Sequence, residues 1–238
     1  DYYEFLDDLD RNFDERKELL VEKLHAVLEE ILYRDNLLIS YTADNDVEEA
    51  IGMNVTLFSV YLSTRKQEKP EENLAPVIRN EGFKTASQVQ YVATAGNYKN
   101  AGFEPSGALR VQETIFSYDY LWINLRVKGG AYGCMSGFKR NGESFLVSYR
   151  DPHLKRTLEV YQGVPDYIRA FEADEREMTK YIIGTISSKD VPKTPQMKGS
   201  VSRTAYFCGV TEEMLQKERD QILNASVEDI RALADIVK

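Results

Sequence analysis

The stretch from Ser106 to Gly133 constrains the fold most, because an amphipathic helix and a double-glycine turn follow each other directly within it. Its apolar residues recur in steps of three and four, the period of a helix with one buried face. They are Ala108, Val111, Ile115, Tyr118, Trp122 and Leu125, widened by Leu109, Phe116 and Leu121. Ser106 is a suitable N-cap, and Gly129 and Gly130 can take the left-handed conformation that ends a helix. The pattern predicts one long helix packed on a sheet.

Arg126 and Tyr132 flank this glycine turn and form the candidate site of the chain. Arg126 lies with Lys128 in the last helical turn, where the helix dipole favours cations. Tyr132 lies where the chain is expected to enter a strand. The residues alone leave an alternative open, in which Arg126 is only a helix cap and Tyr132 only a half-buried packing residue.

The first third of the chain predicts helices around one short strand. Residues 3–34 place Phe and Leu at helical spacing among many charges, with a break expected near Asp14. The β-prone segment from Leu37 to Thr42 predicts a strand, because it ends in a turn-rich cluster of Asp and Asn. A further helix is expected over residues 47–64. The charged segment 65–74 contains a proline and is the best linker candidate.

The middle of the chain predicts strands on either side of the long helix. Residues 86–98 alternate, with Val89, Tyr91, Ala93 and Ala95 on one side and Gln88, Gln90 and Thr94 on the other. After the glycine turn, residues 131–139 and 144–149 predict a β-hairpin. Asn141-Gly142 between them is the preferred dipeptide of a tight type I′ turn.

The last third of the chain predicts several helices. Asp151-Pro152 is typical of a helix start, and the helix is expected to run to about residue 171 with a kink or split at Gly163 and Pro165. Later helices are expected over 174–186, from near 194 to Gly209, after Thr211, and from Ser226, where Asp229 completes a capping box. The order of elements predicts an α+β fold, a mainly antiparallel sheet with helices packed on one face.

Composition and charge narrow the classes of partner. With 238 residues the chain can bury a sizeable core. A net charge of −9 makes a nucleic-acid partner unfavourable and tolerates cationic peptides. Two cysteines do not make a disulfide framework, so a reducing compartment is expected. We expect no membrane partner, since no apolar stretch is long enough to span a bilayer. The chain lacks an initiator Met, which indicates a fragment of a longer protein.

The chain offers little catalytic chemistry of its own. A catalytic zinc needs three protein ligands close together, whereas His25 and His153 are the only histidines and neither HExxH nor HxxEH occurs. Cys134 has no neighbouring His and is expected to be a small core residue. Asp and Glu are plentiful, but mostly at solvated helical spacings. We therefore expect no metal site and no bound cofactor in this chain.

Five stretches carry a family resemblance. They are NEGF at 80–83, QVQYVATAGNY at 88–98, SYDYLW at 117–122, RVKGGAYG at 126–133, and the tail from residue 198 to 234. Together they resemble the C-terminal part of the presequence-protease branch of the pitrilysin/insulinase metallopeptidases. The opening EEILYRDNLLISYTAD is similar to the passage between the third and fourth homologous domains of that family. The RVKGGAYG string is the most specific of these matches.

The resemblance implies a fold and a set of site residues. Members of this family have four related α+β domains of the LuxS/mitochondrial-processing-peptidase-like metallohydrolase fold, in two halves that enclose a chamber. Residues 1–70 would be a helix-strand-helix lead-in from the preceding domain, and 71–238 the C-terminal domain. Arg126 and Tyr132 match the catalytic pair that reaches the substrate from the last domain. Gly129 and Gly130 would line the substrate-binding turn.

The resemblance also implies partners and a setting. Zinc would be bound in the parent enzyme by ligands outside this chain, and the fragment alone would be inactive. The partners would be the N-terminal half of the same protease and unfolded peptide substrates, in the bacterial cytoplasm or an organellar matrix. The chain would stop before the last strand of the family's fold. The alternative function is a non-catalytic peptide-binding or scaffold subunit of the same fold.

Overall fold

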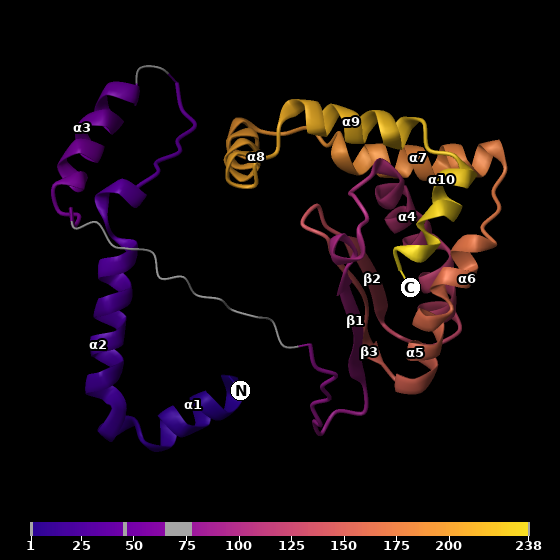
Figure 1. Cartoon of the computed structure of the whole chain (residues 1–238), viewed down its shortest axis with the longest axis horizontal. Coiled ribbons are helices and arrows are strands. Elements are labelled where there is room, and N and C mark those ends of the chain that lie inside the picture. The colour runs from indigo at the N-terminus through magenta and orange to yellow at the C-terminus, as the bar shows by residue number, and fades with distance from the viewer. Residues whose placement is uncertain (1, 45–46, 65–77, 238) are drawn as a thin grey trace. The chain divides into compact units, whose positions relative to one another are not determined.

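The computed structural model describes residues 2–44, 47–64 and 78–237 (Figure 1). The chain divides into two compact units, one of residues 1–80 and 195–203 and the other of residues 81–194 and 204–238. The predicted linker at 65–74 lies outside the described residues. The division predicted at residue 70 therefore stays a prediction.

The first unit is helical. It contains α1 (Tyr2–Arg11), α2 (Phe13–Ile31) and α3 (Glu48–Ser59), so the predicted break near Asp14 occurs at Asn12. The predicted strand from Leu37 to Thr42 is wrong, because these residues form no strand. The cause is the lack of a neighbour: the described part of this unit offers only an isolated bridge between Tyr33 and Ser63, and a strand needs a partner for its backbone groups.

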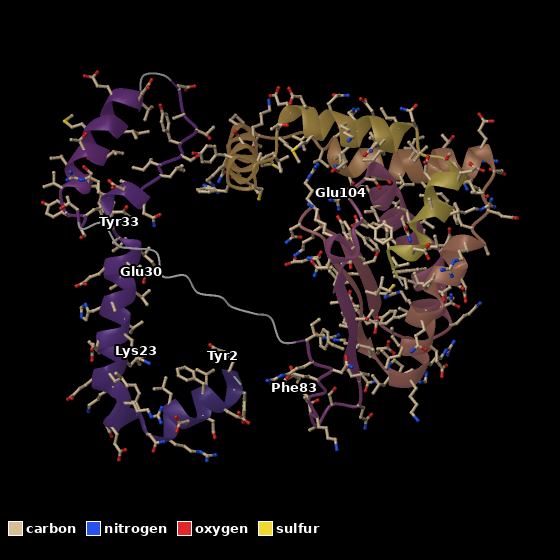
Figure 2. All side chains as sticks on the ribbon, in the orientation of Figure 1. Tyr2, Lys23, Glu30, Tyr33, Phe83 and Glu104 are labelled. Atoms are coloured by element: carbon tan, nitrogen blue, oxygen red, sulfur yellow. The ribbon has the colours of Figure 1, made fainter. Side chains whose placement is uncertain are left out.

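The helices of the first unit bury almost no side chain. None of α1, α2 and α3 contains a buried residue, and Leu62 is the one buried residue among the described residues of this unit. Figure 2 shows Lys23 and Glu30 projecting from α2. The apolar residues Leu24, Val27, Leu28 and Ile31 of this helix are about half exposed. Among the described residues of the first unit, the apolar side of α2 thus packs against no buried core.

The second unit is built on a three-stranded antiparallel sheet, which confirms the predicted α+β class. Its strands are β1 (Gln90–Asn97), β2 (Gly133–Phe138) and β3 (Glu143–Asp151), in the order β1-β3-β2. One face carries the buried Val92, Leu146 and Phe138 and is covered by helices. On the other face Tyr91 and Met135 are exposed. The apolar side assigned to Tyr91, Ala93 and Ala95 is therefore the open face, because the helices cover the side of Val92.

The predicted long helix is real but interrupted. It consists of α4 (Gly107–Tyr118), a break at Asp119, and a π-helical segment, Trp122–Val127. Tyr118 is 68% exposed, which corrects its assignment to the apolar stripe. Ser106 occupies the N-cap position but makes no side-chain capping bond. The amide of Gly107 instead donates to the side chain of Gln221 on the neighbouring helix α9, at 2.9 Å.

The predicted hairpin is confirmed, with a different turn. β2 and β3 pair from Gly133↔Tyr149 to Phe138↔Ser144. Gly142 has φ +94°, whereas Asn141 has no positive φ, so the turn is not type I′, which needs positive φ at both central residues. The Gly142 amide donates to the Lys139 carbonyl, and the Lys139 amide donates to Glu143. This is a tight turn followed by a left-handed glycine.

Helices cover one face of the sheet and close the core (Figure 1). Besides α4, they are α5 (Leu154–Gln162), α6 (Val164–Arg169), α7 (Glu175–Lys189), α9 (Glu212–Leu223) and α10 (Val227–Arg231). The remaining helix, α8 (Pro195–Phe207), contains no buried residue and lies mostly in the first unit. The split at Gly163 is confirmed, as are the caps Thr211 of α9 and Ser226 of α10. Asp151 is the end of β3 rather than the N-cap of α5, which is His153.

A buried ion cluster joins α4, the hairpin, α7 and α9. The side chain of Glu218 on α9 is 7% exposed and is paired with Arg140 and Lys189. Arg110 Nε of α4 lies 3.5 Å from a Glu218 oxygen, and the Arg110 guanidinium also pairs with Glu113. The assignment of acidic residues mostly to solvated positions missed this group, because its partners come from four separate elements.

Candidate functional site

Arg126 lies at the end of the π-helical segment, beside the single tryptophan of the chain. The amide of Lys128 donates to the carbonyl of Ile123, five residues back, which is the π pattern. The Arg126 side chain is half-buried, and its Cζ atom lies 4.7 Å from the centre of the Trp122 ring. A guanidinium over an indole face is held by a cation–π interaction, so this cation has a defined position.

The two glycines do different work in the turn that follows. Gly129 is buried, and a Cβ atom there would collide with the carbonyl oxygens of Leu125 and Asn124. Gly130 is exposed and has φ +78°, which L side chains rarely adopt. The amide of Gly130 donates to Arg126 and that of Ala131 to Leu125. The predicted end of the helix at these glycines is confirmed, whereas their substrate-binding role stays a prediction.

Tyr132 emerges from this turn next to Arg126. The phenol side chain is 57% exposed, and the Arg126 Cζ atom lies 5.6 Å from its ring centre. The Tyr132 amide donates to the carbonyl of Arg150 on β3, at 3.3 Å. The structure therefore brings the two predicted side chains together at one end of the sheet, with the phenol open to solvent.

The structure adds three residues to this pair. Trp122 contacts Arg126, and the Tyr149 ring lies 5.5 Å from the Tyr132 ring. The Cζ atom of Arg150 lies 5.3 Å from the centre of the Tyr132 ring, a contact that the sequence did not predict. The sequence predicts Trp122 on the buried face of the long helix and Tyr149 in a strand of the hairpin. The signal for Tyr149 was available at Gly133, its partner across the hairpin, where the Tyr149 ring occupies the space of the missing side chain.

Asp151 fixes the backbone beneath the site. It is 1% exposed, and its carboxylate accepts hydrogen bonds from the hydroxyls of Ser148 at 2.5 Å and Thr157 at 2.7 Å. The amide of His153 donates to the same carboxylate at 2.8 Å. These bonds join the end of β3 to the start of α5. Arg150 and, through its carbonyl, Tyr132 are therefore attached to a rigid corner.

Cys134 is not a nucleophile in this site. Burial raises the pKa of its thiol to about 11, more than the nearby Arg126 lowers it. The thiol thus stays protonated near neutral pH, and only a thiolate is a strong nucleophile. Cys134 packs against the core, as predicted.

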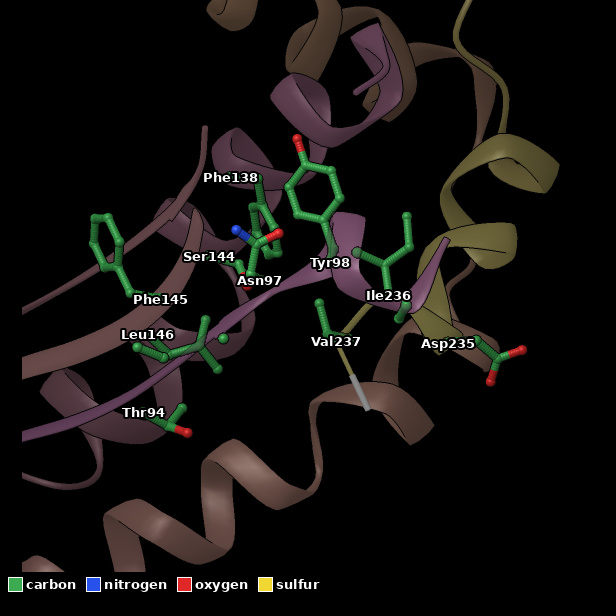
Figure 3. Close-up of a pocket in the computed structure, with 13 residues that line it drawn as sticks. Thr94, Asn97, Tyr98, Phe138, Ser144, Phe145, Leu146, Asp235, Ile236 and Val237 are labelled. Carbon is green, nitrogen blue, oxygen red and sulfur yellow. The ribbon is translucent and has the colours of Figure 1, made fainter. Parts of the chain in front are cut away.

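A cavity of the second unit lies away from this pair. It has a volume of about 280 Å³ and lies at the hairpin-turn end of the sheet, between Thr94–Tyr98 and the C-terminal Asp235–Val237 (Figure 3). Its lining is mainly apolar, and Asp235 points away from the other labelled side chains. Tyr132 pairs near the opposite end of β3. Neither Arg126 nor Tyr132 therefore lines this cavity.

The described ranges contain neither a candidate metal centre nor a helix that could span a membrane. Within them, no three His, Cys, Asp or Glu side chains form a group that could hold a metal ion. These side chains thus do not fit a zinc centre. The same ranges contain no helix that is long and apolar enough to cross a membrane.

The resemblance implied an α+β domain of a peptidase family, and comparison with known proteins confirms that family. The chain belongs to the family described as the PreP C-terminal domain, whose model matches residues 80–238. This match covers the whole stretch from which the candidate site is built.

Curated relatives extend the similarity over the full chain. The chain is 44% identical over 238 residues to Protein HypA of Clostridium perfringens, and this match covers 100% of the chain and 24% of that protein. It is 34% identical over 242 residues to presequence protease 1, chloroplastic/mitochondrial, of Arabidopsis thaliana, covering 99% of the chain and 22% of that protein. The mitochondrial presequence protease of Saccharomyces cerevisiae is 26% identical, with 91% and 22% covered. The chain spans about a quarter of the length of these relatives.

Proposed function

We propose that this chain is the substrate-binding region of a zinc-dependent endopeptidase that degrades unfolded peptides in a closed chamber. Its family and the names of its relatives support a peptidase. The observation that carries the proposal is the Arg126 guanidinium held 5.6 Å from the ring of the exposed Tyr132. The zinc, which would activate the attacking water, is bound in this proposal by the N-terminal half of the same protease.

The chemistry proposed for this chain is stabilisation of negative charge. Attack on a peptide carbonyl places a negative charge on its oxygen, and fixed donors stabilise that charge better than mobile water does. The phenol of Tyr132 and the guanidinium of Arg126 are both donors. Trp122 holds the guanidinium and Tyr149 packs beside the phenol, so little reorganisation is needed when the charge develops. The exposed Gly130 leaves the turn open to a peptide backbone.

The sheet offers a second kind of contact to an extended peptide. β1 lies at an edge of the described sheet, so its outer backbone groups can pair with a peptide as an added strand. The relatives include mitochondrial and chloroplastic proteases and a bacterial protein. We accordingly propose the bacterial cytoplasm or an organellar matrix as the setting.

The test is peptide cleavage by the full-length protease that contains this chain. We expect Tyr132→Phe and Arg126→Gln each to lower kcat by about 10²–10³-fold, the usual cost of removing one donor to a developing oxyanion. Zinc content should stay that of the wild type. Tyr118→Phe is the matched control, because Tyr118 is also an exposed phenol but lies at the end of α4, before the π-helical segment and the glycine turn.

Unchanged turnover in both site variants would refute the proposed role of the pair. If the full-length wild type itself holds no zinc and cleaves no peptide, the alternative of a non-catalytic peptide-binding or scaffold subunit is correct.

A further inference from the structure

A bulge in β3 sets the position of Arg150. Gln90 pairs with Asp151 and Val92 with Ser148, so the single residue Tyr91 on β1 faces two residues, Tyr149 and Arg150, on β3. Arg150 has φ +48°, and among the described residues it is the one non-glycine residue with a positive φ. A left-handed bulge position is normally occupied by glycine. Arg150 therefore adopts a backbone conformation that residues with a side chain disfavour.

The bulge turns the Arg150 side chain toward Tyr132. Its Cζ atom lies 5.3 Å from the Tyr132 ring centre, while its carbonyl accepts the Tyr132 amide. Bulges frequently re-aim a side chain next to a functional site, and backbone strain is concentrated at such sites. Arg150 therefore joins Arg126 at the same phenol, one guanidinium from the strand and one from the helix.

Neither guanidinium is neutralised within the described structure. The ion pairs and side-chain hydrogen bonds of residues 2–44, 47–64 and 78–237 include none made by the side chain of Arg126 or Arg150. Two like charges thus remain around one ring in a chain with a net charge of −9. Both are planar forks of donors, which match the two oxygens of a carboxylate.

We propose that Arg150 binds a carboxylate of the bound peptide beside Tyr132, with the nearby charge of Arg126 favouring the same anion. The carboxylate belongs either to an acidic side chain or to the peptide's C-terminus. The inference rests on the proposed function only in taking a peptide as the ligand. Arg150 is in this view a specificity-determining residue, distinct in role from the donors that stabilise the reacting carbonyl.

Trp122 provides a readout that does not need catalysis. It is the only tryptophan of the chain, and the Arg126 guanidinium lies 4.7 Å from its ring. The emission of Trp122 in the 238-residue chain can therefore be titrated with four otherwise identical peptides. They carry one Glu or one Gln at the centre, each with a free C-terminal carboxylate or a carboxamide.

We expect the wild-type chain to bind the peptide with the recognised carboxylate about 10-fold more tightly than its neutral twin, the effect of one charge-assisted hydrogen bond. A preference that follows Glu against Gln identifies a side-chain carboxylate. A preference that follows acid against amide identifies the C-terminus. Arg150→Gln and Arg150→Gly should both abolish the preference, whereas Arg176→Gln, which removes an exposed arginine of α7, should keep it.

Arg150→Gly also guards against a trivial loss through misfolding. Glycine relieves the positive φ, so this variant should melt at or above the wild-type temperature. Equal affinity of the wild type for all four peptides, or a preference that survives in both Arg150 variants, would overturn the carboxylate site. A preference lost in Arg150→Gln, together with turnover unaffected by Tyr132→Phe and Arg126→Gln in the full-length protein, would keep the carboxylate site and refute the proposed catalytic role of Arg126 and Tyr132.

Discussion

Glu218 is the residue whose charge the fold constrains most. Burial alone would raise the pKa of its carboxyl, but hydrogen bonding and the charge of Lys189, with Arg110 and Arg140, together hold this pKa below its ordinary value of 4.5. A single buried acid thus pairs with cations from α4, the hairpin and α7. Removing one member of such a cluster leaves the others charged and unpaired.

We predict that Glu218→Gln lowers the free energy of unfolding by about 2 kcal/mol at pH 7. Because the folded-state pKa of Glu218 is depressed, its stabilising effect is complete above the unfolded pKa and is lost as pH falls through the folded one. The difference in stability between the wild type and the variant should therefore begin to shrink as pH falls below about 4.5, and it should vanish only below the lower folded-state pKa. Urea unfolding of both chains between pH 3 and pH 7 measures this difference.

The matched control is Glu213→Gln, on the same helix but exposed. It should cost only a few tenths of a kcal/mol, since exposed charges contribute little. A Glu218→Gln chain as stable as the control at pH 7 would show that the cluster contributes no net stability.

At the scale of elements, the corner between β3 and α5 supports the site without touching a ligand. Asp151 accepts three hydrogen bonds there, from Ser148, Thr157 and the backbone of His153. We predict that Asp151→Ala destabilises the chain by about 3 kcal/mol, since bonds to a buried charged group are strong and their donors would be left unsatisfied. For a domain of this size that is a fall in Tm of roughly 6–12 °C.

Ser148→Ala and Thr157→Val provide the graded comparison, each removing one donor and keeping the carboxylate. Each should cost about 1 kcal/mol by thermal unfolding. If Asp151→Ala cost no more than either, the carboxylate would not be the centre of the corner.

Elements determined by neighbouring residues in the chain were predictable, and those determined by distant ones were not. The caps Thr211 and Ser226 and the split at Gly163 depend on residues a few positions away, and all are confirmed. The strand predicted over 37–42 failed because a strand depends on a partner elsewhere in the chain. The covered face of β1 could not be predicted for the same reason, since alternation defines two faces but does not say which one helices cover.

The residues of the candidate site also differ in whether the sequence could predict them, because some are positioned by neighbouring residues and others by distant ones. Arg126, Gly129, Gly130 and Tyr132 lie within seven residues, and the structure brings Arg126 and Tyr132 together as the spacing indicated. Arg150 approaches only through the bulge and the hairpin register. No local sequence pattern predicts an arginine in the left-handed conformation, because glycine or asparagine is the residue expected there.

At the scale of the whole molecule, the two units differ in how much they bury. The second unit contains the core around Leu109, Ile115, Phe116 and Ile168, whereas the described part of the first buries only Leu62. Helices of isolated peptides are marginally stable without packing. The apolar side of α2 would gain stability from a surface supplied by the rest of a longer protein.

We predict that the amides of α2 exchange with solvent far faster than those of α4 and β3 in the 238-residue chain. Local opening costs little free energy where few apolar contacts are made. Hydrogen exchange followed by mass spectrometry gives this comparison, and in the full-length protein the same segment should become protected. Slow exchange of α2 in a chain shown to be monomeric would contradict the prediction.

The length of the π-helical segment Trp122–Val127 is a feature by which loss of the site could be recognised in a related sequence. A π turn accommodates one more residue than an α turn, so deleting a single residue there would restore regular α geometry and rotate what precedes it by about 100° relative to the glycines. Such a shorter chain would keep its turn and its phenol, yet an arginine that precedes the deletion would face another side of the helix relative to that phenol. Segment length, as much as residue identity, thus records whether a relative retains this pair.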